Sequence, residues 1–275
     1  QRAICHYCDY NISLQEILDD RETDSLIAVG YGSEKGETYL RSQLSDAKVV
    51  RLDSDVAVKK DELENIIDRF RKGEVDVLVG TQILAKGHDF AKVTLIALLE
   101  LDQCLNFPDF RAGEKTFQLI VQAAGRAGRA EHAGRVLLQT ANADHAIIKL
   151  ALQHDFKSFA MEELKLRRTL NYPPFTRMAM IEMTSTKKDQ LQDFSKIVGK
   201  WADQFLIAMP DTDLHVLVPA VPPIEFVRKR YRRTLLITST QSSLIKAMLQ
   251  SFRERFTKLP KDLDFKIDID PYTLI

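Results

Sequence analysis

Short runs rich in aliphatic residues alternate with helix-like segments in the first half of the chain, and this alternation constrains the fold more than any other feature. The runs lie at 49–53, 75–79 and 93–99, and the segment 62–72 places apolar residues at helical spacing. Short apolar runs indicate buried strands, and strands that alternate with helices form parallel sheets. We therefore predict an α/β domain in which helices cover both faces of a parallel sheet.

The chain has 275 residues, which suffice for two domains, and its 39 basic side chains balance its 39 acidic ones. Contact with nucleic acid must therefore come from local patches of charge. No apolar run approaches the roughly 20 residues that span a bilayer, and the first residues lack the hydrophobic region of a signal peptide. We expect a cytoplasmic protein without membrane contact. We find no internal repeat, and because residue 1 is not Met, we expect a piece of a longer protein.

The segment 118–129 suggests a phosphate-binding edge. Glycines and arginines, with Gln122 before them, follow one another at the end of a predicted helix. Small residues let a backbone approach another molecule, and guanidinium groups bind phosphate through two hydrogen bonds. The same residues also fit an ordinary helix C-cap followed by a solvated turn. Local chemistry does not decide between these interpretations.

Three segments at 80–90, 105–112 and 122–129 read GTQILAKGHDF, LNFPDFRA and QAAGRAGR. In this order and spacing they resemble the second helicase lobe of the PriA family of primosomal replication-restart helicases, in superfamily 2. The segment 30–35, GYGSEK, is similar to a further stretch of that lobe, with Ser33 in place of Thr. The resemblance implies a RecA-like fold for the predicted α/β domain.

The resemblance also implies roles for individual residues. Those implied to contact DNA are Thr81, Gln82 and Lys86, and those implied to approach the nucleotide are Gly87, Asp89 and Gly125. Gln122, Arg126 and Arg129 would face the triphosphate from across a cleft. Arg129 is the first choice for an arginine finger, which can accelerate phosphoryl transfer by about 10³ to 10⁵, and Arg126 is the second. Without the resemblance, a helix or turn cap is the better explanation of Asp89, and a solvated loop is the better explanation of Lys86.

Two motifs of a complete ATPase are absent from the chain. It contains no Gly-rich loop ending in Gly-Lys-Ser/Thr, and no convincing Asp-Glu pair after an apolar strand. In a helicase of this class both motifs belong to the first lobe, which would hold most of the ATP and Mg²⁺. We expect that this chain alone does not hydrolyse ATP, although its parent protein does.

Cys5 and Cys8 have the spacing with which two thiolates bind one Zn²⁺ ion. By resemblance they match one cysteine pair of the family's zinc-binding insertion. Two ligands do not complete a tetrahedral site, and no cysteine lies between residues 11 and 24 to supply the next pair. Zn²⁺ binding and two free thiols both remain possible interpretations.

The second half of the chain predicts a small α+β domain. After a helix at 156–170, the segment NYPPF at 171–175 breaks the helical pattern, and it resembles the family's entry into its C-terminal domain. The elements that follow have the order β-α-β-β-α-β, which is typical of a split βαβ sandwich with an antiparallel component. We predict a remnant of the zinc-binding insertion at 1–24, the helicase lobe at 25–155, a helical linker at 156–175 and the C-terminal domain at 176–275.

A basic segment lies between the middle strands of this predicted domain. Its candidate DNA-binding residues are Arg228, Lys229, Arg230, Tyr231 and Arg232. Cationic side chains neutralise phosphates, and an aromatic ring can stack on an exposed base. The alternative is that the arginines pair with acidic groups of the helicase lobe while Tyr231 packs into the interdomain joint.

The resemblance implies a nucleoid-associated bacterial helicase that binds branched and single-stranded DNA, translocates 3′ to 5′ with ATP, and restarts replication. It implies single-strand-binding protein, primosome proteins and helicase-loading proteins as partners. One alternative is a non-catalytic module that binds forks and docks proteins. Another is an RNA helicase, which the neutral composition does not exclude.

Overall fold

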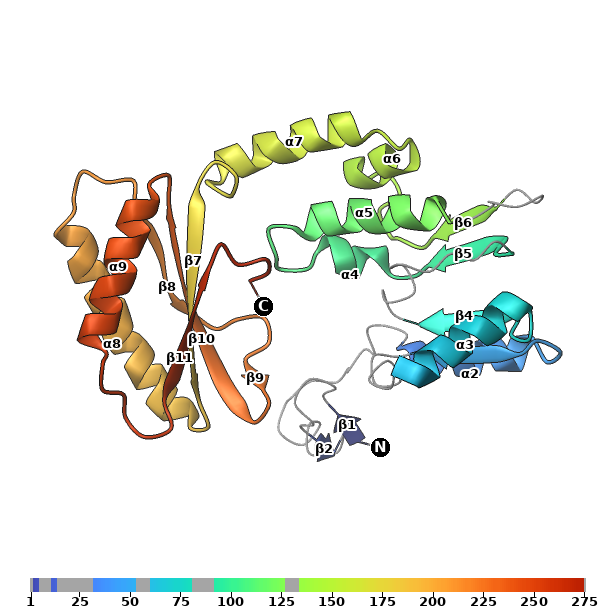
Figure 1. The fold of residues 1–275 in the computed structure, drawn as a ribbon, viewed down its shortest axis with the longest axis horizontal. Coiled ribbons are helices and arrows are strands. Elements are labelled where there is room, and N and C mark those ends of the chain that lie inside the picture. The colour runs from blue at the N-terminus through green and yellow to red at the C-terminus, as the bar shows by residue number, and fades with distance from the viewer. Residues whose placement is uncertain are drawn as a thin grey trace. The chain divides into compact units, whose positions relative to one another are not determined.

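The computed structural model describes residues 2–4, 11–13, 32–52, 60–80, 92–126 and 134–274 (Figure 1). The first two ranges form a short antiparallel pair, β1 (Arg2–Ile4) and β2 (Asn11–Ser13). The described residues fall into two compact units. The central unit contains the described residues from 32 to 107 and Ala112–Ala160, and the C-terminal unit contains β1, β2, Pro108–Arg111 and the chain from Met161 onward.

Parallel strands in the central unit confirm the predicted α/β class. β3 (Val49–Leu52) pairs in parallel with β4 (Val77–Gly80), and β5 (Leu95–Leu98) pairs in parallel with β6 (Arg135–Leu138). The helices α2 (Ser33–Gln43) and α3 (Lys60–Lys72) precede β3 and β4 in the chain. Helix α2 begins at Ser33, within the segment 30–35 that resembles a stretch of the helicase lobe.

A hydrophobic cluster fixes the helices that follow β5. These are α4 (Leu101–Leu105), α5 (Ala112–Ala124), α6 (Ala146–Leu152) and α7 (Phe156–Thr169). Phe117 and Ile120 of α5 are buried together with Ile148 of α6, and Phe117 stacks on Phe159 with ring centroids 4.2 Å apart. The burial of this face sets the rotation of α5 about its own axis.

The C-terminal unit has the predicted β-α-β-β-α-β order. Its main elements are β7 (Arg177–Ser185), α8 (Lys188–Ile207), β8 (His215–Ala220), β10 (Arg230–Ser239), α9 (Ser242–Arg255) and β11 (Asp264–Ile269). The sheet order is β11-β7-β10-β8, and each of these pairs is antiparallel. The predicted split βαβ sandwich is therefore confirmed, with a sheet that is antiparallel throughout. A short strand that the sequence did not predict, β9 (Phe226–Val227), pairs with β10.

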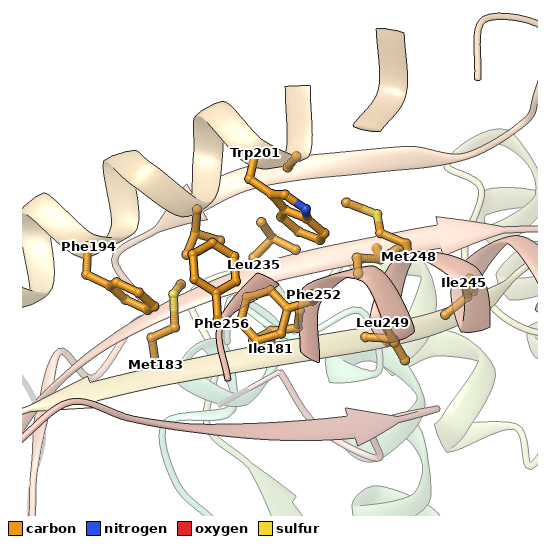
Figure 2. Close-up of a cluster of buried hydrophobic side chains, with 14 of the residues drawn as sticks. Ile181, Met183, Phe194, Trp201, Leu235, Ile245, Met248, Leu249, Phe252 and Phe256 are labelled. Carbon is orange, nitrogen blue, oxygen red and sulfur yellow. The ribbon is translucent and has the colours of Figure 1, made fainter. Parts of the chain in front are cut away.

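Helices α8 and α9 both cover one face of this sheet (Figure 1). Figure 2 shows side chains of both helices meeting those of β7 and β10, including Trp201, Phe252 and Leu235. Trp201 packs edge-on against Phe252 with ring centroids 5.4 Å apart. Ile181 and Leu235 are completely buried beneath the helices. The alternation along β7 and β10, in which every second residue enters this core, accounts for the strand pattern of the sequence.

The two βαβ halves of the C-terminal unit repeat one another. The buried residues Leu191, Phe194 and Val198 of α8 have the same spacing as Ile245, Met248 and Phe252 of α9. Each helix follows a Thr-Ser-Thr sequence at the end of a strand, 184–186 after β7 and 238–240 after β10.

Candidate nucleotide and nucleic-acid interfaces

Helix α5 presents the glycine and arginine segment at its carboxyl end. Because Phe117, Ile120 and Ala123 are buried, the opposite side of the last turn points outward, and Gln122 is exposed. The helix ends at Ala124, where the N–H of Gly125 donates to the carbonyl oxygen of Val121 at 2.9 Å. Gly125 is exposed and Arg126 is half-buried. Arg129 lies outside the described residues.

The backbone of Gly125 does not require glycine. Among the described glycines, only Gly73 has a positive φ, so Gly125 is not a left-handed helix cap. A Cβ atom built on Gly125 would meet its nearest neighbour, the carbonyl oxygen of Val121, at 3.4 Å, which is an ordinary contact. Neither conformation nor packing within the described residues explains why this position lacks a side chain.

The carboxyl ends of β5 and β6 are joined by Asp102. Its carboxylate accepts hydrogen bonds from the N–H of Ala141 at 2.8 Å and from Thr140 Oγ1 at 2.9 Å. The hydrogen bond from Ala141, and after it the one from Thr140, lower the pKa of Asp102 below its ordinary value. Glu100, beside it, has a left-handed backbone with φ of 54°. Asp102 therefore stabilises the strand ends, a role that sequence reasoning missed although the residue directly follows a predicted strand.

Several predicted site residues lie outside the described part of the chain. They are Thr81, Gln82, Lys86, Gly87 and Asp89, together with the cysteines Cys5 and Cys8. Strand β4 ends at Gly80, so the segment that begins with Thr81 directly follows the carboxyl end of a parallel strand. Ligands of open parallel sheets bind at this end of the strands. The described residues include no group of three or more His, Cys, Asp or Glu side chains that could hold a metal ion.

The basic segment of the C-terminal unit forms a β-hairpin whose turn is Arg228 and Lys229. Both residues have left-handed backbones, with φ of 49° and 62°, and both are exposed. Neither makes a hydrogen bond or an ion pair to another described residue. The two cationic groups at this turn are therefore available to phosphate.

The arginines of β10 are instead paired within the same unit. Arg230 Nη2 donates to the carbonyl oxygen of Asp262 at 2.7 Å, and Arg232 Nε donates to Glu182 at 2.7 Å. Arg233, which is buried, forms an ion pair with Glu225 at 2.8 Å. These contacts favour the alternative in which the arginines pair with acidic groups over the one in which they contact DNA. Their partners, however, belong to the C-terminal unit and not to the helicase lobe.

Tyr231 packs inside the hairpin. Its ring lies 4.7 Å from that of Phe226, and Lys188 Nζ lies 5.7 Å from the centre of the ring. Lys188 also forms an ion pair with Glu225 at 3.1 Å. Burial raises the pKa of Glu225, but the hydrogen bonds and positive charges of Arg233 and Lys188 together bring that pKa below its ordinary value. Tyr231 is therefore part of a packed cluster.

Two aspartates that sequence reasoning missed hold the two βαβ halves together. Asp262 accepts a hydrogen bond from the N–H of Thr186 at 2.9 Å, and Asp213 accepts one from the N–H of Thr240 at 2.6 Å. The hydroxyls of Ser185, Thr186, Ser239 and Thr240 also donate to these two carboxylates. The repeated Thr-Ser-Thr sequence was the signal that could have predicted them.

Two family models match the chain. The helicase conserved C-terminal domain matches residues 10–131, and the primosomal protein N C-terminal domain matches residues 168–272. No helix among the described residues is both long enough and apolar enough to cross a membrane.

Curated relatives match almost the whole chain. The replication restart protein PriA of Bacillus subtilis is 33% identical over 277 residues, which cover 100% of this chain and 34% of the relative. The PriA proteins of Synechocystis and Haemophilus influenzae are each 33% identical over 98% of this chain, and they are covered over 32% and 36% of their own lengths. The chain thus spans about a third of the length of these relatives.

Proposed function

We propose, from the premise that the chain belongs to the PriA family of replication restart proteins, that it is the second helicase lobe and C-terminal domain of an ATP-dependent DNA helicase. The parent protein would bind stalled or branched replication forks, translocate 3′ to 5′ and promote primosome assembly. The chain lacks the motifs that hold most of the ATP and Mg²⁺, so it would not hydrolyse ATP alone. Within the parent protein, this chain would supply groups that complete the ATP site.

One observation supports the nucleotide role most strongly: Gly125 is exposed at the end of a helix and lacks any described structural reason to be glycine. A missing side chain at such a position lets the backbone approach another molecule closely. Gln122 is exposed one turn earlier on the same helix. We assign Gly125 to nucleotide contact and Gln122 to contact with the triphosphate.

We assign Arg129 and Arg126 to the stabilisation of negative charge on the transferring phosphoryl group. When ATP and Mg²⁺ are bound by the first lobe, negative charge develops on the oxygens of the transferring phosphoryl group. A guanidinium group that reaches these oxygens stabilises that charge through paired hydrogen bonds. Arg129 is the first candidate for this contact and Arg126 is the second. Gly87 and Asp89 are assigned to the nucleotide ribose.

DNA contacts are divided between the two units. We assign Arg228 and Lys229 to phosphate contact, because both are exposed and unpaired among the described residues. Thr81, Gln82 and Lys86 remain proposed contacts of the helicase lobe with the DNA backbone. The pairing of Arg230 and Arg232 supports a structural role for them instead, in which they hold the hairpin that carries Arg228 and Lys229.

The proposed partners are single-strand-binding protein and the primosome and helicase-loading proteins, and the proposed location is the bacterial cytoplasm at the nucleoid. Zn²⁺ at Cys5 and Cys8 would require ligands from elsewhere in the parent protein. The second candidate function is a non-catalytic module that binds forks and docks proteins. The engagement of most of the basic hairpin in structural pairs leaves this module fewer DNA contacts than its sequence suggests.

Unwinding by the parent protein tests the proposal. Partial duplexes with a 3′ or a 5′ single-stranded tail, made of DNA or of RNA, would be compared with and without ATP. The proposal expects ATP-dependent unwinding of DNA that prefers one tail polarity, 3′ to 5′ along the bound strand. Binding of forks with no ATP-dependent unwinding would favour the docking module, and preference for RNA would favour an RNA helicase.

A further inference from the structure

A four-residue segment of the chain leaves the central unit and returns to it. Pro108–Arg111 belong to the C-terminal unit, whereas Phe107 before them and Ala112 after them belong to the central unit. We call Pro108–Arg111, together with its C-terminal-unit contacts Arg167, Tyr172, Tyr272 and Thr273, the joint. Its contacts come from the end of α7 and from the tail that follows β11.

Asp109 fixes the shape of this segment. Asp109 is 8% exposed, and its carboxylate accepts a hydrogen bond from the N–H of Arg111 at 2.9 Å and one from Thr273 Oγ1 at 2.8 Å. The first hydrogen bond holds the turn, and the second attaches it to the C-terminal tail. A buried carboxylate that accepts hydrogen bonds at this distance makes a specific contact, because leaving it without donors would be costly.

Aromatic rings hold the other side of the segment. The guanidinium of Arg111 lies 4.7 Å from the ring centre of Tyr272 and 5.2 Å from that of Phe110, and its buried Nε makes no hydrogen bond within the described residues. Phe110 stacks on Tyr172 with ring centroids 5.3 Å apart. Arg167, which is 9% exposed and paired with Glu163, lies 5.4 Å from the ring of Phe110. These cation–π contacts hold the segment between two elements of the C-terminal unit.

Helix α5 begins at Ala112, directly after the joint, and ends at Ala124 beside Gln122 and Gly125. A helix of its 13 residues is about 20 Å long and does not bend readily. The joint and the last turn of α5 therefore lie at the two ends of one helix. The chain itself connects the contacts of the C-terminal tail to the proposed nucleotide-facing residues.

We propose that the joint positions α5, so that engagement of the C-terminal unit with DNA sets the placement of Gln122, Gly125 and Arg126 at the nucleotide. The members of the joint are positioning residues and contact neither substrate. This inference rests on the proposed function and deepens it.

Two pairs of variants of the parent protein test the joint. Tyr272→Ala removes the ring over Arg111, and Tyr272→Phe keeps it. Thr273→Val removes the hydroxyl that donates to Asp109, and Thr273→Ser keeps it. Tyr272 is 67% exposed, so its truncation leaves no cavity in the core.

Amide hydrogen exchange of the parent protein gives a readout that is independent of ATP hydrolysis. Residues 108–120 should exchange at least about tenfold faster in Tyr272→Ala and Thr273→Val than in wild type, because local opening becomes easier. Tyr272→Phe and Thr273→Ser should exchange like wild type. Unchanged exchange in both disruptive variants would overturn the proposal.

ATP hydrolysis with and without fork DNA gives the second readout. In Tyr272→Ala, the stimulation of kcat by saturating DNA should fall at least about fivefold, which is the lower end of usual coupling between sites. The basal kcat and the DNA affinity should stay within about twofold of wild type, and Tyr272→Phe should restore stimulation. Full stimulation in both disruptive variants would contradict the coupling. A wild-type parent without any ATP hydrolysis would instead contradict the proposed function, and hydrogen exchange would then decide whether the joint holds α5.

Discussion

Arg232 of β10 donates a hydrogen bond through Nε to Glu182 of β7 at 2.7 Å, across two neighbouring strands of the C-terminal sheet. Both side chains are largely removed from solvent, with 11% and 21% of their surfaces exposed. A basic residue that the sequence assigned to DNA is therefore used to join strands. The distinction between paired and unpaired basic residues of the hairpin leads to the first two predictions.

Arg232→Met should destabilise the C-terminal unit. The substitution leaves Glu182 without its cationic partner, which should lower the free energy of unfolding by about 1–3 kcal/mol. Urea denaturation followed by the fluorescence of Trp201, the single Trp of the chain, measures this effect in the core it belongs to. The matched control, Arg228→Met, should change stability by less than about 0.5 kcal/mol. Equal effects of the two substitutions would show that the pair contributes nothing.

Removal of both charges at the hairpin turn should weaken DNA binding and its salt dependence. For Arg228→Gln with Lys229→Gln, the slope of log affinity against log salt concentration should become shallower by roughly 1.4–1.8, because two phosphate contacts are lost. DNA affinity of the parent protein would be measured at several salt concentrations. Arg253→Gln with Lys258→Gln removes two exposed charges elsewhere in the unit and is the control. If the salt dependence of DNA affinity had the same slope in both double variants, the hairpin turn would be excluded as a DNA contact.

Gly125→Ala should separate stability from activity. The added Cβ makes only an ordinary contact at 3.4 Å, so the free energy of unfolding should be unchanged or higher by up to about 1 kcal/mol. If the nucleotide approaches this backbone, DNA-stimulated ATP turnover of the parent should fall about 10- to 100-fold. The control is Gly199→Ala in α8, where the added Cβ would meet the side chain of Pro219 at 3.5 Å. This variant should leave turnover unchanged. Normal turnover in Gly125→Ala would remove Gly125 from the nucleotide site.

Asp213 and Asp262 should make the C-terminal unit sensitive to acid. Hydroxyl hydrogen bonds, from Thr240 to Asp213 and from Thr186 to Asp262, are the largest causes that lower the pKa of each carboxyl below its ordinary value of 3.8. As the pH falls, the unfolded state therefore binds protons first. The stability that these groups contribute is fully present well above pH 3.8 and is lost as the pH falls through the lower pKa of the folded state.

Urea denaturation of the chain between about pH 6 and pH 2, followed by Trp201 fluorescence, measures this dependence. Wild type should lose stability over the acidic part of this range. Asp213→Asn and Asp262→Asn should each be less stable at neutral pH and should show a smaller loss with acid. If both variants lost stability with falling pH as steeply as wild type, other carboxyls would be the cause of the acid sensitivity.

The sequence predicted the fold where its patterns are local. The alternation of apolar runs and helices predicted the parallel strands β3 to β5, and the element order of the second half predicted the β-α-β-β-α-β unit. Strand β10 begins at Arg230, so it includes part of the basic segment that was predicted to lie between the middle strands. The first four residues of β10 are polar or charged, and their strand conformation depends on pairing with β7 and β9, which no local pattern reveals.

The predicted position of the basic segment between two strands also misled the assignment of its residues. In a strand that begins at Arg230, alternate residues point to opposite faces, so Tyr231 and Arg233 share the face of Leu235, while Arg230 and Arg232 share the other. The acidic partners Glu182, Glu225 and Asp262 come from distant parts of the chain, which is why the pairing could not be predicted. The end of α5 was predicted correctly, because its apolar spacing and its glycine are local signals.

The measurement that tests the account most directly is fork-DNA-stimulated ATP hydrolysis by the parent protein, with wild type compared with Arg129→Ala at matched folding and DNA binding. The account predicts that wild type hydrolyses ATP and that Arg129→Ala loses turnover by about a thousandfold or more while it still binds DNA. Unchanged turnover in Arg129→Ala would contradict the arginine-finger assignment. Absence of turnover in wild type would contradict the helicase itself and favour a fork-binding module.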